Sequence, residues 1–556
     1  MIESSLTDQR IKWLYAFIAI AVVVNLSGLF VTIMGPDGAL YASIAKTMAV
    51  NNNFSDLFAE GRDWLDKPHF PFWAAALSFK LFGFTTWAYK LPGVLIMLMG
   101  VWYTYKFAKD LYNKETGLWA ALILLTAQHT VISNMDVRAE PYLTGFIMAS
   151  VYYFYKGLRQ GWLLPVTLGA LFAACAVMTK GIFALIPVGG AIVGHLLLTR
   201  QWTLLFNWRW LLAGVLVLIF ISPELWCLYR QFDLHPEKLV FGKHGVSGLR
   251  FFFWDSQFGR FFNNGPIKKS AGDPTFFLHT TLWAYLPWSF LFYIAVVQYI
   301  RRGAKKVRET EWFNLCGAGL TFLIFSASKF QLPFYITIIF PFFSIITAVY
   351  ILKLEPGKVY KRIKVMQQAI LVLMMVTIAV LQFYFHPENL SVFFALGMLF
   401  AIAVLCIVTF NKKEVYHKIW FQAAAVAFFV QFYFNLAFYP QLLKYQPDSE
   451  AAFWINTNNN GHLPVVRVLN GLAYSIDFYT HQEIFHYRVG EDNKLPPKPY
   501  LLYADTEMLS ALESAGIKGQ VLKSFKGYHI TKLKGKFLNY HTRDEVLGES
   551  QLLLIK

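Results

Sequence analysis

The sequence is poor in charged residues, and acidic residues are the scarcer kind. Only 15% of its 556 residues are charged, with 33 Asp or Glu against 50 Lys or Arg, so the formal net charge is +17. Soluble globular domains carry about 25% charged residues, and this shortage excludes an ordinary soluble protein. A surplus of positive charge is also typical of nucleic-acid binding, so the positions of the basic residues must decide that point.

Cysteine is rare, and the common cofactor motifs are missing. The sequence contains no Walker loop, no GxGxxG and no Cys/His spacing suited to a metal. All four cysteines lie inside apolar runs, where we expect small core residues that say nothing about redox compartment. They are Cys175, Cys227, Cys316 and Cys406.

Apolar runs occupy most of the chain. A bilayer is crossed by about 20 apolar residues, and runs near this length predict thirteen membrane spans. The first run is long for a signal peptide and lacks a convincing cleavage site, so we interpret it as a retained span. The predicted spans lie near 13–33, 91–108, 117–133, 140–157, 163–179, 181–198, 209–228, 278–300, 311–327, 331–352, 366–385, 390–410 and 418–439.

The basic residues stand at alternate connections between these spans. If the N-terminus is cytoplasmic, all of these connections are cytoplasmic, as the positive-inside rule requires. The charge excess is then explained by membrane orientation, and no nucleic-acid partner is expected. An odd number of spans leaves the C-terminus outside. The basic connections are 106–114, 156–159, 301–308, 353–364 and 411–418.

The opposite face receives residues 34–90, the loop 229–277 and everything after about 440. The apolar run 70–83 is too short to span and would spoil the charge pattern, so we expect an amphipathic helix in the interface. We therefore expect a transmembrane domain over 1–440 that includes these segments of the outer face, followed by a soluble domain over 441–556.

The soluble domain is predicted to contain strands and a helix. Runs at 465–470 and 499–504 are typical of strands, 506–516 of a helix, and 520–533 of a β-hairpin. The predicted fold class is an all-α polytopic membrane protein with a small C-terminal α/β domain outside the membrane. The soluble domain shows no catalytic motif, so we expect a lid or docking module.

Ionisable side chains on the outer face stand in five short segments. Such groups near bilayer depth are costly and indicate function by default. They are Asp37 after the first span, Asp66 and Lys67 in "DKPHF", Asp136, Arg138 and Glu140 in "NMDVRAEPY", Lys180 in "MTKGIF", and Lys329 in "SASKFQLPFY". The three isolated lysines lie on the side where the positive-inside rule disfavours them, which indicates an anion such as the phosphate of a lipid head group.

Structural roles remain open for the same residues. Asp37 begins a predicted amphipathic helix and would serve as its N-cap. Lys67 would anchor the membrane interface beside aromatic residues, and Lys180 would extend its ammonium group out of the bilayer. The segment around Asp136 would be a solvated connection.

Taken in order, these residues resemble the membrane glycosyltransferases of the GT-C class. The resemblance is greatest to the lipid A aminoarabinose transferases and the related dolichyl-phosphate-mannose protein mannosyltransferases, and it covers residues from about 10 to 440. Its elements are Asp37 with Tyr41, Asp66-Lys67-Pro68, Asp136, Lys180-Gly181, "FFWDSQFGRF" (252–261) and the segment from Ser328 to Tyr335.

The resemblance implies transfer of a sugar from an undecaprenyl-phosphate-type donor to a lipid A-like, glycan or protein acceptor. The reaction would take place on the periplasmic side of a bacterial inner membrane, where the C-terminal domain would also lie. Asp37, with Asp136 as the second candidate, would orient or deprotonate the acceptor. The departing phosphate would be stabilised by cations and a hydroxyl group, namely Lys67, Lys180, Arg260, Lys329 and Tyr335. Further site candidates are Tyr41, Asp66, Arg138 and Glu140.

The chain departs from the family at a metal-binding position. The aminoarabinose transferases carry a metal-binding His where this chain has Gln257. One carboxylate does not hold zinc firmly, so we expect no cofactor, and Asp66 is the one candidate ligand for a divalent metal. The expected partners are the lipid-linked sugar donor, a lipid or protein acceptor and the membrane.

Two other classes of protein fit parts of the pattern. A secondary transporter or flippase would place ionisable residues at mid-membrane on broken helices, often in two related halves. Here the charges lie on one face, and no repeat of one half in the other is visible. A structural scaffold is the third class, and in it Asp37 would be dispensable.

The predicted topology can be tested with reporter fusions. A reporter fused after residue 306 should be cytoplasmic, and reporters fused after residues 270 and 450 should be periplasmic. Activity of alkaline phosphatase and of a cytoplasmic reporter at the same sites measures this. Residues 306 and 450 on one side would contradict the odd number of spans.

Overall fold

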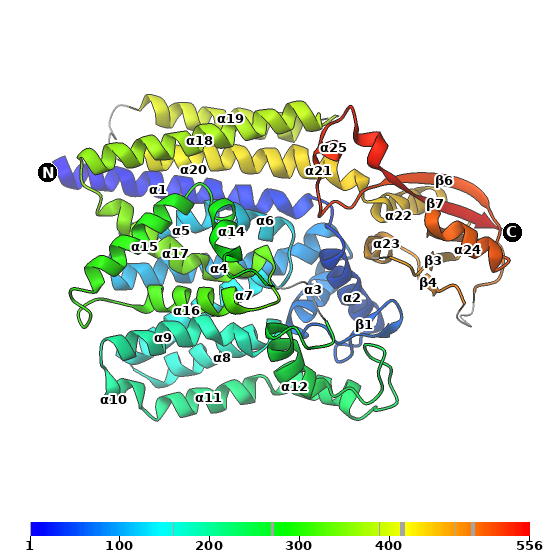
Figure 1. Ribbon diagram of the computed structural model, residues 1–556, viewed down its shortest axis with the longest axis horizontal. Helices are drawn as coiled ribbons and strands as arrows, with labels where there is room; N and C mark the ends of the chain where they lie inside the picture. The colour runs from blue at the N-terminus through cyan, green and yellow to red at the C-terminus, as the bar shows by residue number, and fades with distance from the viewer. Residues whose placement is uncertain are drawn as a thin grey trace.

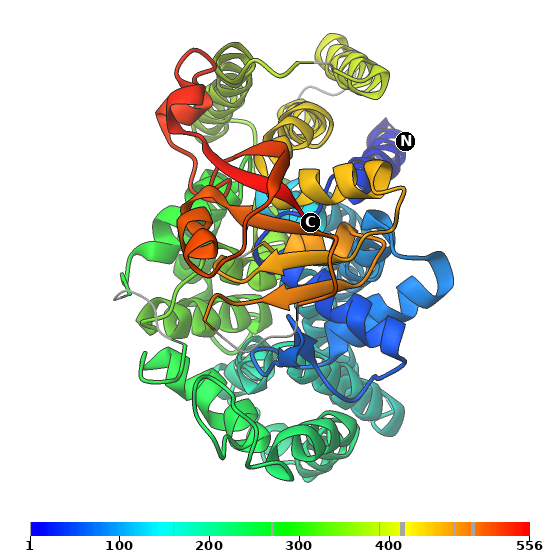
Figure 2. The same ribbon diagram turned by 90° about the vertical axis from the view of Figure 1, so that its right-hand side faces the viewer.

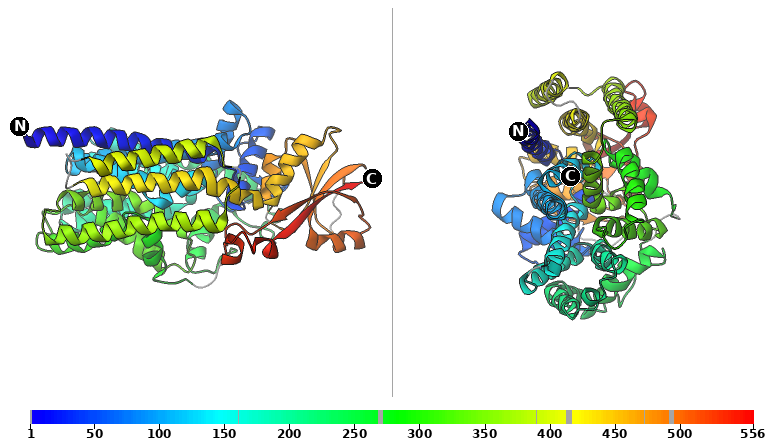
Figure 3. Two further views of the ribbon diagram at one scale, coloured as in Figure 1. Left: turned by 90° about the horizontal axis from the view of Figure 1, so that it is seen from above. Right: turned by 90° about the vertical axis from the view of Figure 1, so that its left-hand side faces the viewer.

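Long helices run along the main axis of the molecule, and the C-terminal domain stands beyond one end of them (Figures 1 and 3). The computed structural model describes residues 2–159, 161–267, 272–388, 390–411, 417–471, 473–490 and 495–556. The N-terminus lies at the opposite end of the bundle from this domain. Helices dominate because backbone groups in hydrocarbon must find their hydrogen-bond partners within the protein.

Each of the thirteen apolar runs contains helix, although several helices are shorter than a span. Within the described residues, eight helices are long and apolar enough to cross a membrane, or nine if the bent pair α5 and α6 forms one span. The span count of thirteen therefore stays a prediction. The helices over these runs are α1 (Ile2–Ser27), α4 (Thr86–Leu111), α5 (Lys114–Thr126), α6 (Gln128–Met135), α7 (Ala139–Arg159), α8 (Leu163–Lys180), α9 (Ile186–Leu198), α11 (Arg209–Phe220), α12 (Ser222–Leu228), α14 (Phe276–Ala284), α15 (Ser289–Gly303), α16 (Phe313–Ala327), α17 (Phe340–Leu352), α18 (Lys358–Phe385), α19 (Val392–Phe410) and α20 (Lys418–Tyr433).

The break between α5 and α6 is stabilised by side chains and backbone of neighbouring helices. The two helices bend by 58°. Gln431 donates to the freed carbonyl of Thr126 at 3.0 Å, and the Gln128 N–H donates to the carbonyl of Leu286 at 3.0 Å. Backbone groups released by a break inside a membrane protein need such partners. The bend carries the end of α6, and with it Asp136, toward the C-terminal domain's end of the bundle.

Helices α4 and α7 pack very closely. A Cβ on Gly145 would lie 2.2 Å from the backbone oxygen of Ile96, and one on Gly100 would lie 2.9 Å from the Cα of Gly145. Small residues permit this approach between membrane helices. The contact holds the start of α7, which carries Glu140.

The segment between the first and second predicted spans forms a cap over the bundle end. It consists of α2 (Asp37–Asn51), the short hairpin β1 (Phe58–Ala59) and β2 (Arg62–Asp63), and α3 (Phe70–Phe82). Helix α3 confirms that 70–83 is helical and has only 13 residues. It exposes Leu77 and Leu81 while burying Phe72 and Phe79.

The C-terminal domain is a five-stranded mixed sheet with helices, and in Figure 2 it covers part of the bundle end. The strand order is β4-β3-β5-β7-β6. Strand β3 pairs in parallel with β4 and β5, and β7 pairs antiparallel with β5 and β6. The elements are α22 (Pro447–Asn458), β3 (Val465–Val468), α23 (Tyr474–Tyr479), β4 (Ile484–Tyr487), β5 (Tyr500–Asp505), α24 (Leu509–Ser514), β6 (Gln520–Gly527), α25 (Gly535–Leu538) and β7 (Gly548–Ile555).

Two expectations from the sequence are wrong. Residues 520–533 do not form a hairpin, because β6 pairs with the distant and more apolar β7. The chain after β6 turns back to the membrane domain instead, where the Tyr540 N–H donates to the carbonyl of Tyr384 in α18 at 2.9 Å. Cys406 is not a core residue either, because it is exposed on the outer surface of α19.

Candidate active site

Most of the residues singled out in the sequence lie together at the bundle end that faces the C-terminal domain. They come from the start of α2, the loop before α3, the start of α7, the end of α8, and the connections near η4 (Phe251–Gly259) and η5 (Pro333–Ile339). The structure organises them into three ion-paired groups, two of which lie against a cavity.

The first group is a chain of two carboxylates and one guanidinium. Arg138 binds Asp37 Oδ2 through Nη1 at 2.6 Å and Asp136 Oδ2 through Nη2 at 2.8 Å. The Asp37 side chain is 49% exposed, whereas that of Asp136 is 11% exposed. Burial raises the pKa of Asp136, and Arg138 opposes this rise. The exposed carboxylate is therefore the one that a ligand can reach.

Asp37 is not the N-cap of α2. It is the first residue of the helix, the preceding Pro36 occupies the cap position, and no side-chain capping bond forms. A carboxylate in the first turn still interacts favourably with the helix dipole. Its strongest contact is the ion pair with Arg138, 101 residues away.

The second group centres on Asp66. One oxygen pairs with Lys67 at 2.5 Å and the other with Arg260. Burial alone would raise the pKa of Asp66, but Lys67 and Arg260 outweigh it and lower the pKa. Burial, together with the charge of Arg260, lowers the pKa of Lys67 to about 8. The group holds two cations and one anion, so it has a surplus positive charge.

The third group joins α7, α8 and η5. Lys180 pairs with Glu140 Oε1 at 2.5 Å, and its ammonium nitrogen lies 3.8 Å from the ring centroid of Tyr335. Arg138 stacks on Phe334, the residue before Tyr335, at 4.9 Å. Cation–π contacts of this kind hold both cations near one aromatic wall.

A cavity lies against the second and third groups. Its polar wall includes Lys180, Arg260 and Tyr335, and most of the remaining wall is aromatic or aliphatic. Such a combination suits a ligand with an anionic head and an apolar chain. The apolar lining residues are Leu143, Phe183, Ala184, Phe261, Phe325, Phe330 and Ile338.

Gln257 shapes this cavity from η4. Its side-chain nitrogen donates to the Lys180 carbonyl at 3.0 Å, and its oxygen accepts from the Phe183 N–H at 3.2 Å. A Cβ at Gly181, whose φ is +92°, would lie 2.1 Å from the Gln257 amide nitrogen. Glycine is therefore required after Lys180 for both conformation and space.

Two sequence candidates stand apart from the ion-paired groups. Lys329 is exposed, and its backbone N–H donates to the Phe261 carbonyl at 3.0 Å. Its neighbours Ser328 and Phe330 line the cavity, but Lys329 does not. Tyr41 is buried edge-on against Phe72, with ring centroids 5.3 Å apart. Burial, then the charge of Asp66, raises the pKa of Tyr41.

The residues present do not fit a divalent metal. Both oxygens of Asp66 are engaged by cations, and the amide of Gln257 is engaged by backbone. Among the described residues, no group of three or more His, Cys, Asp or Glu is arranged to hold a metal ion.

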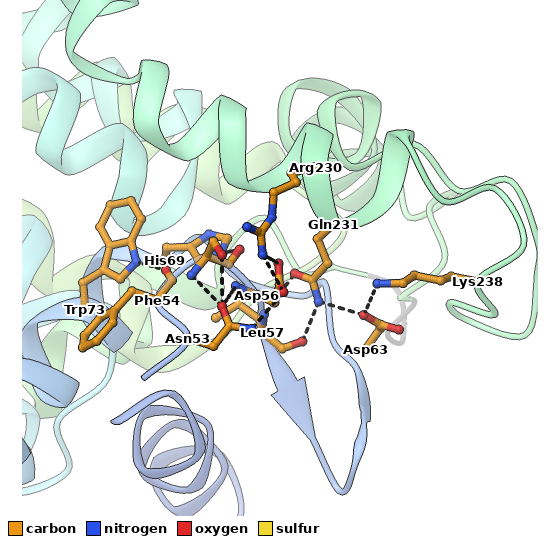
Figure 4. Close-up of polar contacts among 11 residues, drawn as sticks. Asn53, Phe54, Asp56, Leu57, Asp63, His69, Trp73, Arg230, Gln231 and Lys238 are labelled. Atoms are coloured by element: carbon orange, nitrogen blue, oxygen red, sulfur yellow. Dashed lines mark hydrogen bonds and ion pairs between the residues drawn. The ribbon is translucent and has the colours of Figure 1, made fainter. Parts of the chain in front are cut away.

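A polar network fastens the Asp66 loop to the outer loop (Figure 4). Gln231 donates to Asp63 at 2.9 Å and exchanges hydrogen bonds with the backbone of Leu57. His69 lies between Glu224, with Nδ1 to Oε1 at 3.0 Å, and the Ser55 carbonyl at 3.2 Å. Because both ring nitrogens face oxygen acceptors, the contacts suit an imidazolium paired with Glu224. This network fixes the loop that carries Lys67.

The C-terminal domain holds the backbone before Asp37 and a side chain of α2 after it, which the sequence did not indicate. Gln446 accepts from the Gly35 N–H at 2.8 Å and donates to the Ile33 carbonyl at 3.2 Å. The Tyr479 hydroxyl accepts from the Ile33 N–H at 2.8 Å. Lys46 of α2 donates to three carbonyls at the end of α23, at 2.6 to 3.0 Å.

A buried charge cluster strengthens the same junction. The Arg467 side chain is completely buried and pairs with Glu60 at 2.8 Å and with Asp477 at 2.5 Å. Glu60 belongs to the cap segment and Asp477 to α23. Breaking a buried ion pair by removing one partner is strongly destabilising, so the domain is tied firmly to α2 and its flanking loop.

Sequence comparison relates this chain to membrane glycosyltransferases. Residues 66–227 match the family described as dolichyl-phosphate-mannose-protein mannosyltransferase. An undecaprenyl phosphate-alpha-4-amino-4-deoxy-L-arabinose arabinosyl transferase of Pseudomonas aeruginosa is 28% identical over 309 residues, which is 54% of this chain and 52% of that protein. An uncharacterised protein of Aquifex aeolicus is 28% identical over 317 residues, 56% of this chain and 58% of its own. The chain thus spans about half the length of these curated relatives.

Comparison of folds extends the likeness over almost the whole chain. The crystal structure of ArnT from Cupriavidus metallidurans in the apo state has a TM-score of 0.70 at 17% identity and covers 93% of this chain and 96% of that one. The structure of the same protein bound to undecaprenyl phosphate also has a TM-score of 0.70, at 19% identity, and covers 92% and 96%. This chain therefore resembles the GT-C glycosyltransferases of the aminoarabinose transferase type, in sequence over about half its length and in fold over nearly all of it.

Proposed function

We propose that this protein is an integral-membrane glycosyltransferase that moves a sugar from an undecaprenyl-phosphate-type donor to a lipid A-like, glycan or protein acceptor. We place the reaction on the periplasmic face of a bacterial inner membrane. The observation that carries the proposal is the cation-lined, otherwise apolar cavity at the end of the bundle where the exposed carboxylate of Asp37 also lies. The relatives' names and the polyprenyl phosphate bound to the related structure support it.

The cavity supplies a site for the donor. Arg260 and Lys180 line it. Lys67 lies near them because Asp66 pairs with both Lys67 and Arg260. These cations would hold the donor phosphate and stabilise the charge that grows on it as it leaves. The aromatic wall would contain the first isoprene units. Lys329, which is exposed and off the cavity wall, remains a proposed outer contact.

The carboxylate serves the acceptor. During transfer, the bond from the anomeric carbon to the phosphate oxygen breaks, its electron pair stays with the phosphate, and the acceptor oxygen bonds to the anomeric carbon. A hydroxyl acceptor would lose its proton to Asp37, while an ionised phosphate acceptor would only be oriented. Asp136 is buried and fixed to Arg138, so we assign it to positioning Arg138 and thereby Asp37.

The arrangement favours a transferase over a transporter. The ionisable groups lie at helix ends and in connections on one side of the bundle. A transporter would place its site near mid-membrane. The ion pairs also fix the groups relative to one another, as catalysis by preorganised charge requires.

Replacing the exposed acid tests its role. Asp37→Asn should lower turnover on the order of 10²-fold or more, the usual contribution of a positioned acid or base, and should leave affinity for undecaprenyl phosphate nearly unchanged. Turnover and donor binding of the purified protein measure this. Asp255→Asn, which neutralises a nearby acid off the cavity wall, is the control. Wild-type turnover in Asp37→Asn would mean that another carboxylate acts.

The pKa of Lys67 predicts a pH dependence. The folded-state pKa is lowered to about 8, so the ammonium form is complete below that pH and is lost as pH rises through it. Affinity for undecaprenyl phosphate should fall by up to about tenfold per pH unit above 8. Lys67→Arg should remove this fall, because arginine stays charged. An equal fall in the arginine variant would assign the titration to another group.

The hydrogen bonds between Gln446 and the backbone before α2 predict that turnover and donor binding respond differently to a substitution. Gln446→Ala removes both hydrogen bonds to the backbone before Asp37, and a misplacement of the acid by about 1 Å costs up to 10²-fold in rate. Turnover should fall while affinity for undecaprenyl phosphate stays, because the donor cations lie on other elements. Gln482→Ala, elsewhere in the same domain, is the control. Equal losses of turnover and donor affinity would indicate general destabilisation instead.

A further inference from the structure

A second cavity lies at the opposite end of the bundle from the site described above. It has an open volume of about 870 Å³ and is lined by residues of α15, α17 and the connection that follows α15. In Figure 1 this connection lies at the end of the bundle where the N-terminus is found. The topology expected from the sequence makes this the cytoplasmic end.

The cavity wall carries cations without carboxylate partners. Lys306 is paired with Glu309 at 3.0 Å. Among the described residues, Arg302 and Lys353 have no such partner, and the Lys353 ammonium only approaches the ring of Tyr112 at 6.0 Å. Two free cations beside one hollow attract an anion.

The wall also holds two buried polar atoms that lack hydrogen-bond partners within the described chain. They are Glu311 Oε2 and the hydroxyl of Tyr350. The other oxygen of Glu311 accepts from Tyr112, from Tyr299 at 2.7 Å and from Asn314 at 2.9 Å. Glu311 is thus held rigidly with one oxygen still able to accept. Buried polar groups are nearly always satisfied, so each of these two atoms needs a partner that the described chain does not supply.

The two observations specify complementary chemistry. A phosphate accepts hydrogen bonds from Arg302, Lys353 and the Tyr350 hydroxyl, whereas Glu311 Oε2 needs a donor such as an alcohol. A phosphate ester with a free hydroxyl group provides both. Val297 and Ile300 of α15 are apolar and 48% and 45% exposed. They stand on the face of the helix away from the cavity-lining Arg302, where they would meet the acyl chains of the surrounding bilayer.

We propose that this cavity binds a phosphate ester bearing a free hydroxyl, and that its source is the glycerol-phosphate head group of an anionic phospholipid in the adjacent leaflet. Basic pockets between membrane helices on the cytoplasmic side recognise anionic head groups in this way. The site lies at the other end of the bundle from Asp37 and does not depend on the proposed transfer reaction. Its role is to bind lipid, with no chemical step.

The test compares lipids that differ in one property. Binding of short-chain phosphatidylglycerol to the full-length purified protein is measured directly and through its effect on thermal unfolding. Phosphatidylmethanol has the same charge and no free hydroxyl, and phosphatidylethanolamine has no net charge. We expect the affinity to be highest for phosphatidylglycerol, lower for phosphatidylmethanol and lowest for phosphatidylethanolamine. Equal binding of all three would overturn the proposal.

Substitutions test the two cations and Glu311 separately. Arg302→Ala and Lys353→Ala should each weaken phosphatidylglycerol binding about fivefold, the effect of one basic residue near an anionic lipid. Arg301→Ala removes the same charge one residue away, off the cavity wall, and should change little. Equal losses in Arg301→Ala and Arg302→Ala would reduce the effect to surface charge and overturn the site.

Glu311→Gln should abolish the preference for phosphatidylglycerol over phosphatidylmethanol while leaving charge-dependent binding. A preference that survives this change would contradict the role of Glu311. Thermal unfolding without lipid reports whether each variant folds. If Arg302→Ala does not fold, Lys353→Ala still tests the contribution of the cations. Competition by soluble glycerol 1-phosphate would support a phosphate ester with a free hydroxyl group as the ligand, but a soluble molecule as its source. Its failure to compete, with lipid binding intact, supports the phospholipid.

Discussion

Charge pairing at the bundle end is the constraint on which the rest of the site depends. Charged groups this close to hydrocarbon are stable only with partners, and the chain satisfies them in interlocked sets. Arg138 joins Asp37 to Asp136, and Asp66 lies between Lys67 and Arg260. The pairs Arg138–Asp37 and Arg260–Asp66 join different elements of the chain. The electrostatic contacts that stabilise this end of the bundle therefore also fix the relative positions of the site residues.

The same pairing separates the carboxylates by role. Asp136 and Asp37 share one arginine, but only Asp37 keeps a half-exposed side chain. Asp66 stays ionised between two cations, and it lowers the free positive charge that they present. A ligand phosphate would compete with Asp66 for Lys67 and Arg260, so donor binding would be coupled to a rearrangement of this group.

The C-terminal domain takes part in the geometry of the site. We had expected a lid or docking module, and the contacts show that it also anchors the segment before Asp37 through Gln446 and Tyr479. The buried Arg467 fixes the same junction. A domain without a catalytic motif can therefore affect turnover, because it determines where the acid of another domain lies.

The sequence alone determined the helices, the segregation of basic connections and the residues that gather at one end. These follow from local rules, since hydrophobicity, hydrogen bonding in a bilayer and charge placement act within a single span. Only the tertiary structure decided which charges pair, that Lys329 stays off the cavity wall, and that β6 pairs with β7. Asp66 and Arg260 are 194 residues apart, and Gln446 meets Gly35 across 411. Such contacts depend on how whole elements pack, which no local pattern records.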